Sequence, residues 1–349
     1  MSIRSIPLVV VILGALPWIS FGASDETKSS TTIASIIDDT DECSATCGTA
    51  TDPESAKACG MCHKAIFNEW DGAKHSQAWN DKVYQAAIEK KKRKKTCYAC
   101  HIPDRVLARV GRKPKTRPKS KKNLYHEGVT CVSCHEKDGV IYGPYGNKTD
   151  AHKSVKDPLF TDAKSSSLCL SCHKTKIDVV LPVGKDFEKA GLTAKGKSCA
   201  GCHMPEVTRH LSVSPTTGKP IGEKLKGRSH KLLGPDNAEF CATAFKLSAT
   251  KKDGQLVLTI VNEAEHRVPG LRTREFHFLV VQKDKAGKKL LDKKINVNSE
   301  NGLMAEESRE FPLEFAAGVA SVEVAIEHHF MDKLVATIKT HKLSVGAAK

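Results

Sequence analysis

The sequence predicts two parts of different architecture: a mainly α-helical and irregular region over residues 56–235, then an antiparallel β-sandwich over residues 241–349. Three observations support this division. A Cys-x-x-Cys-His pattern recurs five times between Cys59 and His203. Aromatic residues make up only 5% of the chain, which is thin for 349 residues that must build all their cores from side chains. From about residue 241 the sequence changes to short apolar runs typical of strands.

Residues 1–23 have the pattern of an export signal peptide, with the basic Arg4, a nearly continuous apolar run over Ile6–Leu16 and small residues at the expected cleavage point. A retained membrane anchor is the alternative, but the run is short for a membrane span and is interrupted by Pro7 and Pro17. We therefore expect a periplasmic or extracellular protein with no transmembrane span after signal cleavage.

Residues 24–55 are rich in Ser, Thr, Asp and Ala and predict a flexible N-terminal arm. The arm contains Cys43 and Cys47, which match no copy of the repeated pattern. An exported protein favours disulfides, so either these two pair with each other or one of them pairs with Cys241. One thiol is left over in both cases.

The repeated pattern places two thiols one helical turn apart, directly followed by an imidazole, and this is the attachment motif of c-type haem. Zinc sites and redox disulfides also use Cys-x-x-Cys, but His fills only 15 of 349 positions and follows all five pairs. We therefore predict five covalently bound haem c groups, which also supply the apolar core of residues 56–235. The attachment cysteines are Cys59, Cys62, Cys97, Cys100, Cys131, Cys134, Cys169, Cys172, Cys199 and Cys202, and the proximal iron ligands are His63, His101, His135, His173 and His203.

A basic island spans residues 90–122, with fifteen Lys and Arg against the single acid Asp104, a balance of +14 in a chain whose total is +15. One interpretation is a docking patch for acidic redox partner proteins near Lys90–Lys122. The other is a solvated loop that neutralises haem propionates. The run Lys90–Lys95 also resembles a nucleic-acid patch, which an exported haem protein makes improbable.

Five histidines outside the motifs lie near them in the sequence and are candidate distal ligands: His75, His126, His152, His230 and, the weakest of the set, His210. Five further histidines, His266, His277, His328, His329 and His341, fall in the predicted sandwich and are interpreted as sheet or surface residues. Five candidates for five irons suggest that every haem has two histidine ligands. Such an iron has no open position for a substrate, so no catalytic residue is predicted.

The C-terminal part shows about seven short strand-like segments, among them Leu256–Val261, Phe276–Val281, Lys288–Val297 and Val322–Glu327. Gly-containing turns separate some of them, at residues 252–254 and 285–287. This spacing predicts the antiparallel sandwich. No triad, carboxylate pair or phosphate loop stands out, so we expect a structural role or a contact surface.

Three segments carry a family resemblance: residues 59–75 with Trp70, residues 126–135, and residues 199–205. They resemble the exported multihaem cytochromes related to cytochrome c-554, over roughly residues 55–235. The resemblance implies closely packed haems in a wire-like chain and an electron-shuttle role. The fifth motif and the added sandwich depart from the four-haem pattern of that family.

The leading functional hypothesis is a pentahaem cytochrome that transfers electrons between redox partners. One alternative is a multihaem reductase or oxidase of a small nitrogen or sulfur compound, acting at a haem that lacks its distal histidine, with His210 as the ligand expected to fail. The other is a subunit of an extracellular conducting filament, in which a neighbouring molecule supplies a distal histidine.

Overall fold

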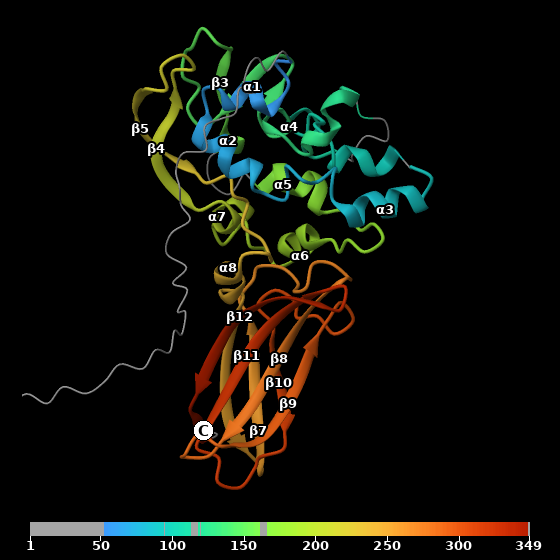
Figure 1. The fold of residues 1–349 in the computed structure, drawn as a ribbon, viewed down its shortest axis with the longest axis vertical. Coiled ribbons are helices and arrows are strands. Elements are labelled where there is room, and N and C mark those ends of the chain that lie inside the picture. Colours follow the sequence, from blue (N-terminus) through green and yellow to red (C-terminus); the bar gives the residue numbers. More distant parts are fainter. Residues whose placement is uncertain (1–51, 94, 113–117, 119, 161–165, 348–349) are drawn as a thin grey trace, which may run out of the picture. The chain divides into compact units, whose positions relative to one another are not determined.

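The N-terminal part of the chain consists of short helices joined by long irregular segments, as the ribbon of the computed structural model shows (Figure 1). The structure describes residues 52–93, 95–112, 118, 120–160 and 166–347. The α-helices here are α1 (Ala56–Gly60), α2 (Lys64–Asp71), α3 (Lys82–Lys90), α4 (Cys131–His135), α5 (Ser166–His173), α6 (Val183–Lys189) and α7 (Cys199–His203). Four 3-10 helices are interspersed: η1 (Lys95–Cys100), η2 (Leu107–Arg109), η3 (Lys122–Glu127) and η4 (Pro158–Phe160).

Two small sheets interrupt this helical and irregular region. Strands β1 (Glu136–Lys137), β2 (Val140–Gly143) and β3 (Ser154–Lys156) form one of them, and β4 (Glu206–Val213) and β5 (Pro220–Arg228) form an antiparallel hairpin. The segment between the fifth motif and α8 is therefore largely this hairpin. Its residues alternate between the two faces, a period that the Pro and Gly residues of the connecting turn obscure.

The N-terminal part buries few large apolar side chains relative to its length. Trp70, Ile88, Ile102 and Phe187 are buried there, together with four leucines and smaller residues, but the extended cluster of apolar side chains found among the described residues lies after Ala238. A chain of this length normally needs a substantial apolar core. The packing is therefore consistent with the prediction that prosthetic groups fill this region.

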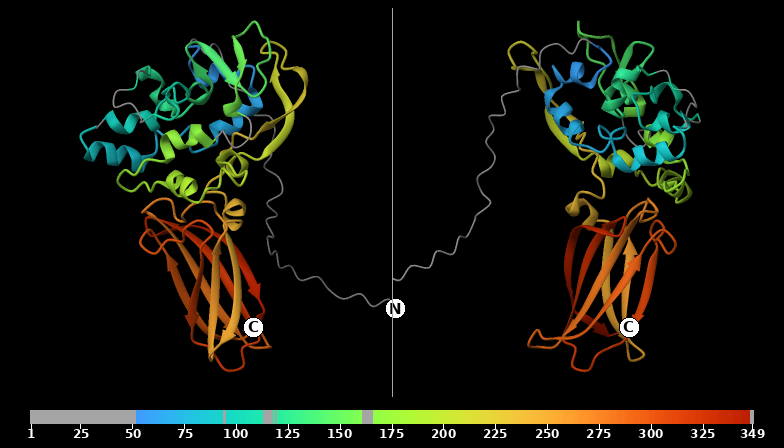
Figure 2. Two further views of the ribbon diagram at one scale, coloured as in Figure 1. Left: turned by 180° about the vertical axis from the view of Figure 1, so that it is seen from behind. Right: turned by 45° about the vertical axis from the view of Figure 1, so that its right-hand side comes forward.

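The C-terminal part begins with α8 (Ala238–Ala242) and continues as two four-stranded sheets. One sheet has the order β10-β7-β6-β13 and the other β12-β11-β8-β9. Their strands are β6 (Phe245–Lys252), β7 (Gln255–Asn262), β8 (Arg274–Lys283), β9 (Lys289–Val297), β10 (Ser308–Leu313), β11 (Ser321–Phe330), β12 (Lys333–Leu343) and β13 (Val345–Ala347). Neighbouring strands are antiparallel except β6 and β13, which are parallel and so depart from the predicted pattern. The strands run lengthwise through this part in all three views (Figures 1 and 2).

The two sheets share one hydrophobic core. Phe245 of β6 packs its ring against Phe276 and Phe278 of β8, with ring centroids 5.1 and 5.2 Å apart. Alternate residues of β7 and β11 also point into the core, among them Leu258 and Val324, which are fully buried. The four segments predicted as strands lie in β7, β8, β9 and β11, apart from Lys288, and the predicted turn at residues 252–254 connects β6 and β7. Gly254 adopts φ 78° there, a conformation that favours glycine.

The extra thiol of the C-terminal part, Cys241, is buried in α8, and its Sγ lies 3.9 Å from the carbonyl oxygen of Gly234. The predicted signal peptide lies outside the described residues, and so do Cys43 and Cys47, the two candidate disulfide partners of Cys241. The disulfide prediction therefore stays a prediction.

Candidate functional site

The five Cys-x-x-Cys-His motifs lie on short helical turns. Three of them form α4, the end of α5 and α7, which places both cysteines of each motif on one side of a single turn. The first motif spans the end of α1 and the turn before α2, and the second lies on η1 and the residue that follows it. In α7 the Ser198 hydroxyl accepts a hydrogen bond from the backbone N–H of Gly201 at 2.9 Å and caps the turn. This is the local geometry that two thioether bonds to one haem require.

Four of the motif histidines donate a hydrogen bond from Nδ1 to a backbone carbonyl oxygen. The acceptors are Leu211 for His63, Ala78 for His101 and Tyr142 for His135, each at 2.7 Å, and Leu233 for His203 at 2.5 Å. A carbonyl oxygen can only accept, so Nδ1 carries a proton, and in the neutral ring the lone pair of Nε2 is then free. This is the tautomer of a histidine that binds metal through Nε2, and the carbonyl bond also fixes the ring.

Four motif histidines face a second histidine at nearly the same separation. The distances between ring centroids are 6.4 Å for His63 and His152, 6.2 Å for His173 and His75, 6.2 Å for His135 and His230, and 6.2 Å for His203 and His266. Two imidazoles bound on opposite sides of one ion by bonds of about 2.0 Å would place their ring centres about 6 Å apart. The residues present therefore fit iron ligation on both sides at four of the five motifs.

Three of the second histidines, His75, His230 and His266, have a lowered pKa and so the neutral state that ligation needs. Nδ1 of His230 donates to the carbonyl oxygen of Arg228 at 2.9 Å, and Nδ1 of His266 donates to that of Arg267 at 2.8 Å. Burial lowers the pKa of His75 and of His230 to about 4. These rings are neutral at pH 7 and can offer a lone pair to a metal.

His266 is the ring that sequence reasoning missed. It lies in the loop between β7 and β8, and the Nδ2 of Asn262 donates to its carbonyl oxygen at 2.9 Å. The adjacent Arg267 forms an ion pair with Asp186 of α6, with one N–O distance of 3.0 Å. This ion pair holds the loop next to α6, and Glu265 pairs with Lys197, in the segment between α6 and α7, at 3.1 Å. Both contacts help to place His266 opposite His203. The sequence signal that could have identified His266 was its position between two predicted strand segments. A histidine in such a loop is not held in the sheet and can contact another part of the protein.

His101 differs from the other motif histidines. The ring packed flat against it belongs to Tyr84, with centroids 3.7 Å apart and planes inclined by 4°. Within the described part of the chain, no second histidine ring faces His101 as one faces each of the other four. Trp79, Tyr98 and Tyr125 contact one another near this motif, so its surroundings are aromatic.

His126 and His210, two of the predicted distal ligands, do not face a motif histidine among the described residues. His126 is exposed, and its backbone carbonyl oxygen accepts from Asn80 Nδ2 at 2.7 Å. His210 lies on β4, and its Nδ1 donates to the carbonyl oxygen of Gly222 across the hairpin at 3.0 Å. The structure thus brings three of the five predicted candidates, His75, His152 and His230, opposite motif histidines.

Contacts between cysteines of different motifs show which motifs are neighbours. The thiol of Cys59 interacts with that of Cys131, that of Cys100 with Cys172, and that of Cys169 with Cys199. The third motif also adjoins the fourth, since the charge of Cys172 contributes to raising the pKa of the buried Cys134 thiol to about 12, second to burial itself. The fourth motif therefore borders the second, third and fifth, and the third borders the first.

Arg109 joins two of these motifs from within the structure. Its side chain is 1% exposed and pairs with Asp104 at 3.1 Å. It donates to the carbonyl oxygen of Ala99 in the second motif at 2.7 Å and to that of Ser171 in the fourth at 3.4 Å. Part of the basic island is thus buried structure, although the sequence treats the island as one solvent-facing patch. Five of its residues, Lys94, Lys113, Lys115, Arg117 and Lys119, lie outside the described residues.

Comparisons with known proteins agree with this geometry. Residues 58–136 match the family model described as cytochrome c554 and c-prime, and residues 124–178 match the model of the doubled CXXCH motif. The crystal structure of a penta-heme cytochrome c552 from Thermochromatium tepidum superposes with a TM-score of 0.56 at 17% identity, covering 78% of this chain and 90% of that one. At that identity the likeness shows a shared fold. An alkylpurine DNA glycosylase of Pseudomonas fluorescens aligns over 32% of each chain with 9% identity and a TM-score of 0.15, too low to indicate a common fold. No curated protein matches the sequence.

Fold and motifs together define a multihaem c-type cytochrome, in which haem is bound covalently and serves electron transfer. Its N-terminal part carries the matches to the cytochrome c554 family model and to the doubled CXXCH motif, and β-sheets follow it. Proteins of this class are exported. None of the helices in the described ranges has the length and apolarity needed to cross a membrane.

Proposed function

We propose that this chain is a pentahaem electron-transfer protein in which four irons have two histidine ligands and the remaining iron, on His101 of the second motif, keeps one axial position free. The observation that carries the proposal is the set of four facing histidine pairs with ring centroids 6.2–6.4 Å apart. The distal ligands are His152, His75, His230 and His266, for the irons on His63, His173, His135 and His203. His266 replaces His126 and His210 in the predicted ligand set.

The protein's own residues do three things in this proposal. The ten motif cysteines fix each haem at a set place, the paired imidazoles exclude substrates from four irons, and the Nδ1–H to carbonyl bonds hold the rings and raise their basicity as ligands. Haem iron supplies reversible one-electron redox chemistry, with a potential set by ligands, burial and hydrogen bonds. Four filled iron sites support electron transfer as the main function.

The contacts between motifs support a branched order of haems. The first motif borders the third, the third borders the fourth, and the fourth also borders the second and the fifth. An electron entering at the first haem would pass through the third and fourth and leave by the second or the fifth. The two sheets, with their shared core, would form the predicted sandwich and supply His266 to the fifth haem.

A single open iron should be visible in the purified, haem-loaded protein. We expect about one high-spin haem in five by magnetic circular dichroism or electron paramagnetic resonance. The reason is that the ring packed on the proximal ligand His101 is Tyr84, and that no second histidine faces His101 among the described residues. Carbon monoxide should bind the reduced protein at the same stoichiometry. Two or more high-spin haems would contradict the proposed ligand pairs, and a fully low-spin protein would contradict the open site.

The open iron also favours a second candidate function, reduction or oxidation of a small nitrogen or sulfur compound at the His101 haem. Only an iron with a free axial position can bind such a substrate directly. Turnover of nitrite or hydroxylamine that cyanide blocks would support this function. A reduced protein that binds no small ligand at any haem would exclude it. The filament hypothesis is less favoured, because four distal histidines are found within one chain and only the His101 iron could take a ligand from a neighbour.

We further propose that the exposed end of the basic island docks acidic redox partners outside the cytoplasm, in the periplasm or at the cell exterior. Lys90, Lys92 and Lys95 are exposed, whereas Lys91 pairs with Asp178 at 2.6 Å and Arg93 with Glu89 at 2.7 Å. The three exposed lysines lie between the last residue of α3, which is Lys90, and the second motif. An anionic partner attracted to them would approach near the His101 haem.

Replacing Lys90, Lys92 and Lys95 with Gln should slow oxidation of the reduced protein by the anionic oxidant ferricyanide, by up to about tenfold at low ionic strength. Stopped-flow rates would show the difference shrinking as salt rises, because exposed charges are screened. The matched control replaces Lys285, Lys288 and Lys293, three exposed lysines of the β-sheet part, and should leave the rate nearly unchanged. Equal slowing by both triple variants would show that net charge, and not this patch, sets the rate.

A further inference from the structure

The sheet β12-β11-β8-β9 carries four polar side chains in a two-by-two arrangement on the face away from the core. Glu275 and His277 are two residues apart on β8, and Glu327 and His329 are two residues apart on β11, so each pair shares a face. The antiparallel register sets Glu327 opposite His277 and His329 opposite Glu275. Each histidine therefore has one glutamate beside it on its own strand and another across the strand pair. The neighbouring Phe276 and Phe278 point the other way, into the core.

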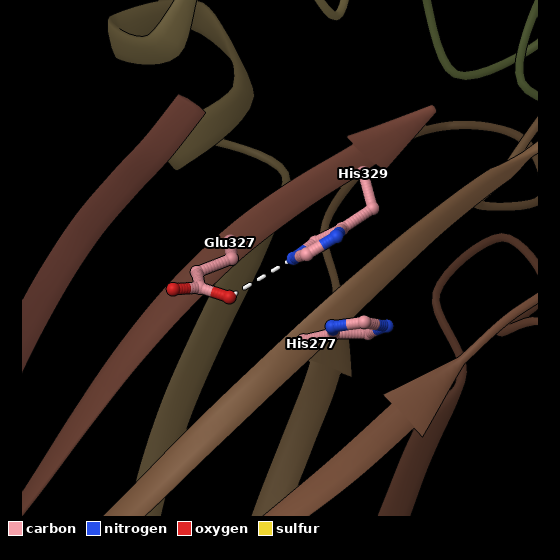
Figure 3. Close-up of side chains that lie close together, drawn as sticks. All are labelled: His277, Glu327 and His329. Atoms are coloured by element: carbon pink, nitrogen blue, oxygen red, sulfur yellow. Dashed lines mark hydrogen bonds and ion pairs between the residues drawn. The ribbon is translucent and has the colours of Figure 1, made fainter. Parts of the chain in front are cut away.

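The four side chains are in contact. Nε2 of His277 lies 3.0 Å from Oε2 of Glu275, and Nε2 of His329 lies 2.9 Å from Oε2 of Glu327. The two imidazole rings lie one against the other, with centroids 3.9 Å apart (Figure 3). His277, Glu327 and His329 each offer one ligand atom, and these three atoms lie within 4.8 Å of one another.

The cluster is sheltered from water and leaves polar atoms unused. The side chains of His277 and His329 are 11% and 13% exposed, although they lie on the sheet face away from the core. Asn296, which faces His277 from β9, donates from Nδ2 to Glu275 at 2.8 Å. Its Oδ1 and the Nδ1 of His329 are buried without a hydrogen-bond partner within the described residues. A site with spare polar atoms and little water suits a bound ligand better than a surface ion pair.

We propose that His277, Glu327 and His329 bind one divalent transition-metal ion, of the class of Zn²⁺, Cu²⁺ or Ni²⁺, with a fourth position left for water. Two imidazoles and one carboxylate are a ligand set that zinc uses in proteins, and imidazole also suits copper and nickel. Three ligands at about 2.0–2.2 Å from one ion lie about 3–4 Å apart, so small side-chain rotations close the site. Mg²⁺ and Ca²⁺ prefer oxygen ligands and are not expected there.

Glu275 and Asn296 act as supporting residues in this site. The Glu275 carboxylate contacts the His277 ring and is itself held by the amide of Asn296. Carboxylates that bond to a ligating histidine orient its ring and make it a stronger ligand. The site belongs to the β-sheet part and shares no residue with the haem-binding motifs, so it does not depend on the proposed haem ligation.

The test is a Zn²⁺ titration of the full, haem-loaded protein after EDTA treatment, in which isothermal calorimetry measures the binding. The wild type should bind a Zn²⁺ ion at a site that the double variant His277→Ala, His329→Ala lacks. Glu327→Gln should weaken that site by more than about tenfold, and Glu275→Gln by about 10–100-fold. Excess Mg²⁺ should not compete. Glu327→Gln preserves the size of the side chain, so a loss of affinity there reports a lost ligand and not a lost fold.

Glu323→Gln is the matched control, because Glu323 lies on the same strand and the same face as Glu327 but pairs with Lys283. It should bind Zn²⁺ as the wild type does. The haem absorption spectrum should stay the same in all variants, which separates this test from that of the haem ligands. If the wild type takes up no more Zn²⁺ than the double variant, or if Glu323→Gln weakens binding as much as Glu327→Gln, the proposed site is wrong.

Discussion

Replacing His266 with Ala is expected to convert a second haem of the protein from low spin to high spin. His266 faces His203 at 6.2 Å between ring centroids, and burial lowers its pKa, so in the proposed ligation it is the neutral distal ligand of the fifth haem. Its loss leaves that iron with one protein ligand. Attachment should survive because Cys199, Cys202 and His203 are untouched. Magnetic circular dichroism of the oxidised protein would then show about two high-spin haems in place of one, and added imidazole should restore the low-spin state.

The controls for this experiment are His126→Ala and His210→Ala. Both residues were candidate distal ligands on sequence grounds, and neither faces a motif histidine in the described part of the chain. Their spectra should match the wild type. The proposed ligand set fails if His266→Ala keeps the wild-type spin state, or if His210→Ala produces the high-spin signal in its place.

Replacing Arg109 with Met is expected to lower the free energy of unfolding by about 3–5 kcal/mol, the largest stability effect we predict. The Arg109 and Asp104 side chains are 1% and 5% exposed, so removing the guanidinium leaves a buried carboxylate without its ion-pair partner. Bonds from Arg109 to the second and fourth motifs are lost as well. Guanidinium chloride unfolding, followed by far-UV circular dichroism, would measure the change in midpoint.

Two further variants separate burial from charge in this result. Arg105 belongs to the same island, but its side chain is 23% exposed and pairs with Glu54 and Glu136. Arg105→Met should therefore lower the free energy of unfolding by only about 1 kcal/mol or less. Combining Arg109→Met with Asp104→Asn should recover part of the loss, because the unpaired charge is removed. Equal midpoints for Arg105→Met and Arg109→Met would show that the buried pair has no special role.

Much of the haem region could be predicted because its signal is local. A motif such as Cys131–His135 carries its two thiols and its imidazole within five residues, and a single turn of helix sets their geometry. The strands were predictable for a similar reason, since short apolar runs such as Leu256–Val261 and the alternation in Val322–Glu327 are local signals of a strand. The hairpin of β4 and β5 was missed because its pairing depends on residues on both sides of a turn.

The distal ligands were only partly predictable, because the distance along the chain to a haem says little about the distance in space. His126 is five residues from the third motif and yet is exposed, whereas His266 is 63 residues from His203 and faces it. The same reason explains Arg109. Its sequence neighbours made it one of fifteen cations in a basic island, while the fold buried it between two motifs.

Local sequence patterns establish the class of this protein, the number and position of the Cys-x-x-Cys-His motifs and the change to β-structure after residue 241, and they predict which histidines are the proximal ligands. These features depend on covalent chemistry and on side-chain periods of a few residues. The folded chain was needed to show which histidines face His63, His135, His173 and His203, that Tyr84 packs against His101, and where His277 and His329 meet. Each of these is an encounter between segments distant in the chain, and such encounters are fixed by packing and by hydrogen bonds that a local pattern does not contain.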